Sequence, residues 1–193
     1  VESGSEKIRN EMRKKFSNDD IDYTATQLFK NNIVQSWLFI VGYPSETEQD
    51  FQETLDLLKR SKHLGKDGML RINVTPPYMH IPTNNINTDP DLSTYYGLTD
   101  LNFNDPLTVH FWKSELYPEN DFLARVDRWR RLIKLSLDLG LTWHDERLIS
   151  KWKNEIDGLE KVYIEKYKGK DHITPDDTKT KIINIHQVYP QDG

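Results

Sequence analysis

Cysteine is absent from this chain of 193 residues, and its absence excludes several kinds of chemistry. Without thiols, the chain forms no disulfide and offers no thiolate nucleophile. It also cannot ligate an iron–sulfur cluster or a zinc ion through sulfur. A lack of disulfides fits a reducing compartment, so we expect a cytoplasmic location.

Long apolar runs and an excess of positive charge are also missing. No stretch approaches the roughly 18 apolar residues of a membrane-spanning helix, and the first residues are polar where a signal peptide would be apolar. We therefore expect no membrane partner. The 26 Lys and Arg residues face 31 Asp and Glu residues, which gives a formal net charge of −5. This composition argues against nucleic acid as a partner, because proteins that bind phosphate backbones are usually basic.

The first part of the chain alternates between helical and strand patterns. The predicted helices cover 5–15, 19–31 and 46–63, and the predicted strands cover 33–41 and 69–75. The unbroken apolar run 37–41 indicates a strand that is covered on both faces, as in a parallel sheet between helices. Strand, helix and strand in this order predict a βαβ unit. The first residues resemble the end of one more such unit.

The second part begins with a long connection, 76–118, that is rich in Pro, Asn, Asp and Thr and shows no sustained period. Helical spacing then predicts one helix over 119–140 and another from Thr142 to about Tyr167. The segment Lys181–Tyr189 has a strand-like pattern. We therefore predict an α/β domain over 1–83, followed by a loop and a mainly α-helical C-terminal extension over 84–193.

Two turns lie where ligands gather in parallel α/β proteins, at the carboxyl ends of strands. They are Glu2-Ser3-Gly4 and Gly42-Tyr43-Pro44. Each precedes a Ser-x-x-Glu pattern typical of a capping box, Ser3 to Glu6 and Ser45 to Glu48. Unpaired N–H groups at helix starts suit carboxylates and phosphates, and Gly42 lets a ligand ring approach the backbone because it has no Cβ. Taken singly, these features are also explained by plain caps and turns.

Three segments resemble a known family when they are taken in order. VESGSEKIRNEM, FIVGYPSETEQDFQETLDLL and INVTPPYMHIP are similar to the second half of the barrel of radical S-adenosylmethionine (SAM) enzymes, over about residues 1–83. The likeness is greatest to the branch with cobalamin-binding and methylthiotransferase-like members. The resemblance implies a partial (β/α) barrel with parallel strands.

The resemblance also implies a set of residues that bind the cofactor. The first two would contact the sugar or amino-acid part of SAM, the next four would pack on its adenine, and the last would lie beside the same cofactor. These residues are Glu2, Ser3, Ile40, Gly42, Tyr43, Pro44 and Pro77.

The cysteine loop that binds the [4Fe–4S] cluster in this family is absent. The resemblance therefore implies that SAM and the cluster belong to a parent enzyme, of which this chain is a C-terminal portion that is inactive alone. No cofactor is expected to be bound to this chain by itself. The missing N-terminal half of the barrel is then the expected partner, and dependence on cobalamin stays open. One alternative is a non-catalytic binding or scaffold module derived from such a barrel. A cysteine-free α/β enzyme of another kind would need an acid/base pair, and none stands out.

Polar residues alternate along the second strand, and we predict that Arg71, Asn73 and Thr75 face the barrel interior and bind substrate. The alternative is an edge strand on which these residues form a solvent-exposed face. The basic residues of 119–140 are interpreted as the solvated side of an amphipathic helix; the alternative is that they bind an anionic substrate or RNA. These residues are Arg125, Arg128, Arg130, Arg131 and Lys134. No metal site is assigned, because the histidines show no metal-ligand spacing. No catalytic residue is assigned, because the cluster-binding loop that starts the chemistry in the resembled family is absent. Exposed strand edges predict a homo-oligomer, or covering by 181–189.

Overall fold

The computed structural model describes residues 1–79, 95–99, 105, 107–143 and 146–167. Its larger elements are α1 (Glu6–Glu11), α2 (Asn18–Lys30), β1 (Gln35–Phe39), α3 (Glu48–Arg60), β2 (Leu70–Val74), α7 (Phe122–Asp138) and α8 (Glu146–Tyr167). Short elements are a 3₁₀ stretch (Lys62–Gly68), β3 (Leu98–Thr99), α6 (Thr108–Phe111), β4 (Lys113–Ser114) and β5 (Thr142–Trp143). The predicted strand 181–189 lies outside the described residues.

Three of the described strands form a parallel sheet in the order β1-β2-β5. Trp37 lies beside Ile72, and Phe39 lies beside Val74. On the other edge of β1, Glu2 forms a parallel bridge with Phe39. The predicted parallel β1-α3-β2 unit is therefore confirmed, and the chain has a mixed α/β fold. The described strands do not close into a barrel.

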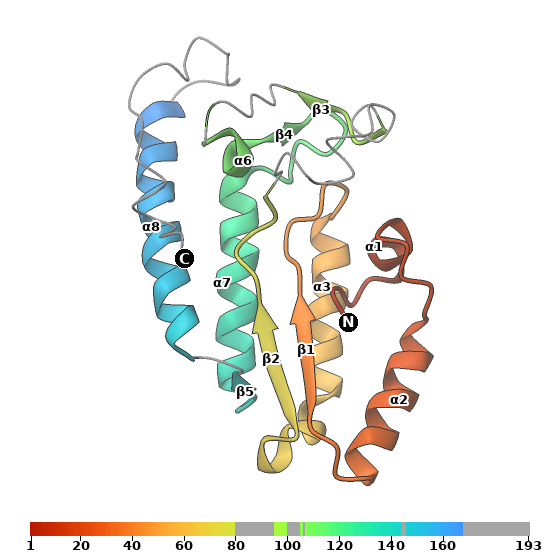
Figure 1. Cartoon of the computed structure of the whole chain (residues 1–193). Helices are drawn as coiled ribbons and strands as arrows, with labels where there is room; N and C mark the ends of the chain where they lie inside the picture. Colours follow the sequence, from red (N-terminus) through yellow and green to blue (C-terminus); the bar gives the residue numbers. More distant parts are fainter. Residues whose placement is uncertain (80–94, 100–104, 106, 144–145, 168–193) are drawn as a thin grey trace, which may run out of the picture.

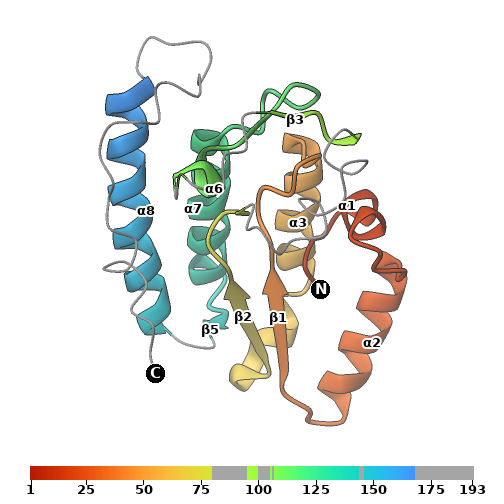
Figure 2. The same cartoon turned by 45° about the horizontal axis from the view of Figure 1, so that its top comes forward.

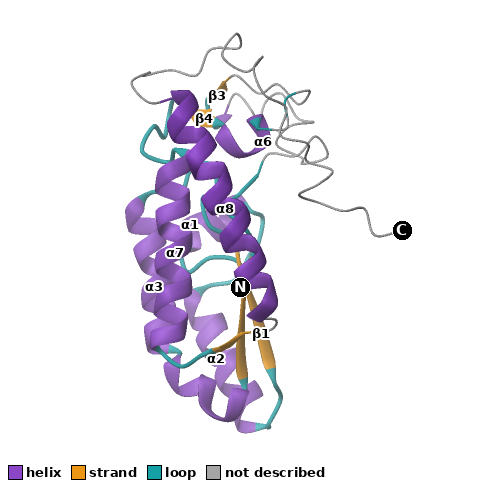
Figure 3. Cartoon of the chain, turned by 90° about the vertical axis from the view of Figure 1, so that its left-hand side faces the viewer, coloured by secondary structure: helices purple, strands orange, loops and turns teal. Residues whose placement is uncertain are grey.

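Helices cover one face of this sheet. Figures 1 and 3 show α3 and α7 on the same side of β1 and β2. Trp37, Phe39, Ile72 and Val74 face this side and join one core cluster with residues of α3 and α7. On β1, the intervening residue Leu38 is only partly buried. The prediction that the apolar run is covered on both faces is thus wrong for the described part of the chain, because the burial of β1 alternates.

Three of the longer helices begin at capping residues. The side chain of Ser17 accepts a hydrogen bond from the Asp20 N–H at the start of α2, and Thr47 accepts one from the Asp50 N–H at the start of α3. The helix 119–140 is confirmed as α7, capped by Asp121.

Both predicted capping boxes are wrong. Helix α1 begins after Ser5, whose side chain makes no capping bond. Helix α3 begins two residues later than Ser45 requires, because Thr47 and Asp50 form the box instead. Several hydroxyl and carboxylate residues precede α3, so the sequence pattern alone did not identify the residue that caps it.

The end of the molecule toward which β1 and β2 point carries the described parts of the long connection. Figures 1 and 2 show α6, β3 and β4 at this end. The strands β3 and β4 pair antiparallel.

The last part of the chain differs in one detail from the prediction. Thr142 and Trp143 extend the sheet as β5, paired with β2, before α8 begins at Glu146. The expected helix start at Thr142 is therefore wrong. Helix α8 passes through Gly158 without a break. Within the described residues, no helix is long and apolar enough to span a membrane.

Candidate functional site at the strand ends

Three chain segments meet at the carboxyl ends of the strands. The Glu2 N–H donates to the Leu38 carbonyl oxygen at 2.7 Å, and the Ile40 N–H donates to the Glu2 carbonyl oxygen at 2.9 Å. On the other side, the Tyr78 N–H donates to the Val41 carbonyl oxygen at 2.7 Å. The structure thus places the two turns singled out in the sequence, and the segment that contains Pro77, side by side.

Glu2 has two features that are rare for an ordinary surface residue. Its φ is +69°, a left-handed conformation that strains residues with a Cβ. One carboxylate oxygen, Oε1, lies 3.3 Å from the Lys14 ammonium. The other, Oε2, is buried and has no hydrogen-bond partner among the described residues. Leaving a buried acceptor unpaired costs about 1–3 kcal/mol, so Glu2 offers an unused acceptor at the strand ends.

Ser3 and Gly4 connect this turn to α3. Ser3 is fully buried, its Oγ accepts from the Ser5 N–H at 3.1 Å, and it lies 3.2 Å from Thr54 Oγ1. At Gly4, a Cβ would come within 2.5 Å of the Glu53 carbonyl oxygen. Both residues therefore have a packing role against α3, and the proposed contact of Ser3 with a cofactor stays a prediction.

The turn of Gly42, Tyr43 and Pro44 is more enclosed than expected. Gly42 has φ +83°, and a Cβ there would overlap the aliphatic part of the Arg125 side chain. We expected this glycine to leave room for a ligand ring. On the side where a Cβ would point this expectation is wrong, because the Arg125 side chain fills that space. Tyr43 is buried, and its hydroxyl lies 3.0 Å from the Tyr96 hydroxyl. Burial raises the pKa of Tyr43.

A buried polar network that the sequence did not reveal surrounds this turn. Glu46 Oε2 accepts from the Gly42 N–H at 2.8 Å and lies 3.5 Å from Arg128 Nη1. Asn120 donates to the carbonyl oxygens of Tyr43 at 2.7 Å and of Pro44 at 3.1 Å. Burial raises the pKa of the Glu46 carboxyl to about 7, although the positive charge of Arg128 lowers it.

The basic residues of α7 fall into two groups. Arg125 and Arg128 are buried, so the interpretation as a solvated helix side is wrong for these two. Desolvation lowers the pKa of Arg125 to about 9; its guanidinium lies 3.7 Å from the centre of the Trp112 ring. The other members are partly or mostly exposed and form ion pairs at the surface. They are Arg130, Arg131 and Lys134.

The expected substrate residues lie on the less covered face of the sheet. Arg71 is exposed, and Asn73 and Thr75 are half-buried, while Ile72 and Val74 between them are buried. In register, Arg71 lies beside Ser36, and Asn73 lies beside Leu38. The alternation read from the sequence is confirmed. A role in substrate binding stays a prediction.

Of the remaining expected cofactor residues, Ile40 is half-buried, whereas Pro44 and Pro77 are buried. Within the described parts of the chain, no three His, Asp or Glu side chains are placed to hold a metal ion.

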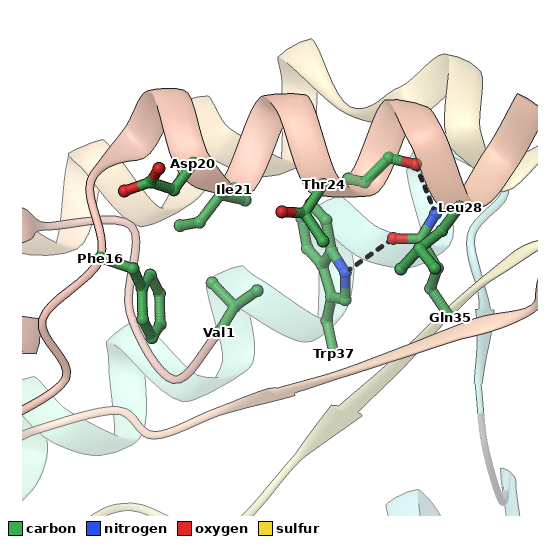
Figure 4. A pocket seen from close by; sticks show the side chains of 9 residues that line it. Val1, Phe16, Asp20, Ile21, Thr24, Leu28, Gln35 and Trp37 are labelled. Carbon is green, nitrogen blue, oxygen red and sulfur yellow. Dashed lines mark hydrogen bonds between the residues drawn. The ribbon is translucent and has the colours of Figure 1, made fainter.

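A separate pocket of about 320 Å³ lies between α2 and the edge of β1 (Figure 4). Most of its lining is apolar: Val1, Phe16, Ile21, Ala25, Leu28 and Trp37. Its polar members are largely engaged within the protein. Gln35 donates to the Ala25 carbonyl oxygen at 2.8 Å and accepts from the Trp37 indole at 3.3 Å. This pocket suits apolar side chains better than a polar cofactor.

Comparisons with known proteins connect part of the chain to enzymes that modify tRNA. Over 65 residues, the chain is 46% identical to a tRNA-2-methylthio-N(6)-dimethylallyladenosine synthase of Rickettsia prowazekii, which covers 33% of this chain and 15% of that protein. The enzyme of the same name from Petrotoga mobilis is 38% identical over 64 residues, and that from Buchnera aphidicola is 37% identical over 62 residues. These matches cover 32% and 31% of this chain and 15% and 14% of the relatives.

The matched segment thus spans about 15% of the length of these relatives. No family model and no solved structure matches the chain. The local similarity supports the resemblance to the methylthiotransferase-like branch of radical SAM enzymes for about a third of the chain.

Proposed function

We propose that this chain is the C-terminal portion of a radical SAM enzyme related to methylthiotransferases, and that it forms part of a (β/α) barrel. In this role the strand ends contribute one wall of the SAM pocket, and residues 84–193 cap the substrate. The local similarity to the methylthio synthases supports this assignment. Three parts of this assignment are proposed: the residues that contact SAM, the place of this chain within a larger enzyme, and the barrel.

The observation that carries the proposal is the unused carboxylate oxygen of Glu2. This oxygen is buried, has no hydrogen-bond partner in the part of the chain that the structure describes, and belongs to a residue with a strained backbone at the carboxyl end of parallel strands. SAM carries an amino group and two ribose hydroxyls, which are donors that such an acceptor requires. The residues present therefore fit one part of SAM.

The chain's own residues would bind and orient the cofactor. Glu2 would accept a hydrogen bond from a donor of SAM, and the half-buried Ile40 beside it would offer an apolar surface to the adenine. SAM bound to a [4Fe–4S] cluster supplies the radical in enzymes of this kind, and the cysteines that hold the cluster must come from outside this chain.

The partner in this proposal is the N-terminal half of the barrel. Supporting observations lie at the edge of β1, where Glu2 continues the sheet by a single bridge and the apolar pocket opens beside Trp37. A further strand next to β1 would pair with its edge and cover this pocket. The name of the relatives includes tRNA, but the net charge of −5 does not favour RNA, so we leave the substrate class open.

The first test is a titration of SAM into the full chain, followed by calorimetry and by amide chemical shifts. We expect weak binding, with shifts concentrated near Glu2, Ile40 and Gly42. The variant Glu2→Gln should weaken binding about tenfold, because the charge-assisted bond is lost. Ser36→Ala, a change at an exposed position near the start of the neighbouring strand β1 and away from the strand ends, is the matched control and should leave binding unchanged.

No binding at millimolar SAM, or equal binding by Glu2→Gln, would contradict the cofactor role. The second candidate, a non-catalytic binding module, would then be preferred. The enclosure of the Gly42 turn favours this second candidate, because Tyr43 and Pro44 are buried by the chain's own residues.

A further inference from the structure

The start of α7 contacts the turn formed by residues 42–45, although about 76 residues of sequence separate them. We call these four residues the strand-end turn. The Asn120 side-chain amide donates to two successive carbonyl oxygens of this turn, Tyr43 at 2.7 Å and Pro44 at 3.1 Å. Asn120 is fully buried. A single amide group thus donates to two neighbouring carbonyl oxygens. Without it, these two oxygens would lie close together with no hydrogen-bond donor between them.

Arg128 lies in α7, about two helical turns beyond Asn120, and completes the arrangement. Its Nη1 donates to Asn120 Oδ1 at 3.1 Å and to the Glu46 carbonyl oxygen at 3.0 Å. The Glu46 carboxylate in turn accepts from the Gly42 N–H at 2.8 Å. Asn120, Arg128 and Glu46 therefore engage the backbone at both ends of the strand-end turn.

The packing around Gly42 points the same way. The aliphatic part of Arg125 occupies the space where a Cβ would lie. The guanidinium of Arg125 donates to the carbonyl oxygens of His110 at 2.8 Å and of Trp112 at 3.1 Å. One helix thus binds the turn together with the described part of the long connection.

The same helix also reaches the end of β2, where the Trp129 indole donates to the Thr75 carbonyl oxygen at 3.0 Å. These polar contacts differ from ordinary core packing. Val126 and Leu132 of α7 join the apolar core, and their burial would hold the helix against the sheet without fixing the backbone of either strand end.

We propose that Asn120 and Arg128 are positioning residues that set the conformation of the strand-end turn. This inference rests on the proposed function for its consequence: the C-terminal extension would then control the shape of the SAM-binding corner. A change in the position of α7, such as one caused by a substrate in the cap, would be transmitted to the cofactor through these contacts.

The test measures native-state hydrogen exchange of the Gly42 and Glu46 amides in the full chain. The Glu46 N–H donates to the Tyr43 carbonyl oxygen at 2.8 Å, which also accepts from Asn120, so both amides report on the turn. The variant Asn120→Asp keeps the side-chain shape but replaces the donor with a negative oxygen. We expect exchange of these two amides to rise by roughly tenfold or more, because two hydrogen bonds are lost.

The matched control is Ser136→Ala, on the same helix. Ser136 is also fully buried, and its Oγ donates to the Ile133 carbonyl oxygen and accepts from the Trp143 indole. Its contacts are remote from the strand-end turn. This variant should leave the exchange of the Gly42 and Glu46 amides unchanged relative to the amides of α3. Arg128→Lys, which keeps the charge beside Glu46, serves as the second variant in case Asn120→Asp does not fold.

Exchange at the turn that stays the same in both Asn120→Asp and Arg128→Lys would overturn the proposal. So would an equal rise in Ser136→Ala, because general destabilisation would then explain the effect. A SAM titration of the same variants distinguishes the cofactor role of the strand ends from the positioning role of Asn120 and Arg128. If the unaltered chain binds no SAM while exchange responds as expected, the cofactor role fails and the positioning role stands. If SAM binds to the unaltered chain and to Asn120→Asp with equal affinity, the turn does not shape the cofactor site.

Discussion

The buried carboxyl of Glu46 offers the sharpest test of the network around the strand-end turn. Burial raises its pKa from the ordinary 4.5 to about 7. A raised pKa means that the folded state binds the proton more tightly than the unfolded state. The contribution to stability is therefore full below about pH 4.5 and is lost as the pH rises toward about 7. The difference in pKa corresponds to about 3 kcal/mol.

The variant Glu46→Gln carries no titrating group at this position, so it separates this effect from all others. We expect the free energy of unfolding of the unaltered chain, minus that of Glu46→Gln, to fall by about 3 kcal/mol between about pH 4.5 and about pH 8. Urea unfolding followed by tryptophan fluorescence gives both values at each pH.

Glu48→Gln is the matched control with the opposite sign. Glu48 is exposed, and hydrogen bonds from Arg131 and Arg128 outweigh its desolvation and lower its pKa. Its contribution to stability is present above its ordinary pKa and is lost in acid, so this difference should not fall as the pH rises. If the Glu46 difference is constant or grows with pH, the attraction to Arg128 outweighs burial, and our account of this carboxyl is refuted.

Three further substitutions test the packing of the strand ends. Gly42→Ala should destabilise the chain by about 2–4 kcal/mol, because a Cβ meets Arg125 at a positive φ; an unchanged urea midpoint would show that Arg125 moves freely. Gly4→Ala should cost about 1–3 kcal/mol, since its Cβ meets the backbone of Glu53 at 2.5 Å; thermal unfolding measures this loss, and a neutral result would contradict the close approach of the turn at Gly4 to α3. Ser17→Ala should cost about 1 kcal/mol through the lost cap of α2, and circular dichroism melting that shows no shift would contradict the capping role.

The local pattern of the sequence predicted most of the elements in the described parts of the chain. The alternation of Arg71, Ile72, Asn73 and Val74 gives both the strand and the sides on which its residues lie, because side chains of a strand point alternately to opposite faces. The helices were predicted for a similar reason, with errors of a few residues at their ends. The capping boxes failed because adjacent residues such as Ser45 and Thr47 are chemically equivalent as caps.

The candidate site was predictable only in part. The turns at Glu2 and Gly42 were found because glycine, proline and hydroxyl residues mark strand ends in any sequence. The strain and the unpaired oxygen of Glu2 had no local signal, since they depend on the strand beside it. The run 37–41 was expected to be buried on both faces because all five of its residues are apolar. This prediction failed because apolar content alone does not show whether helices cover one face of a sheet or both.

By itself, the sequence determined the order of the larger strands and helices, the parallel β1-α3-β2 unit and the two turns at the strand ends. Only the tertiary structure decided that Arg125 and Arg128 are buried and that Asn120 binds the strand-end turn. The physical reason is distance along the chain. Helical periodicity places a residue on one side of its own helix, but the carbonyl and carboxylate groups that make the burial of Arg128 favourable come from Glu46 and Glu48, about 80 residues away. The carbonyl oxygens that pair with Arg125 come from His110 and Trp112, in a connection that showed no sustained sequence period.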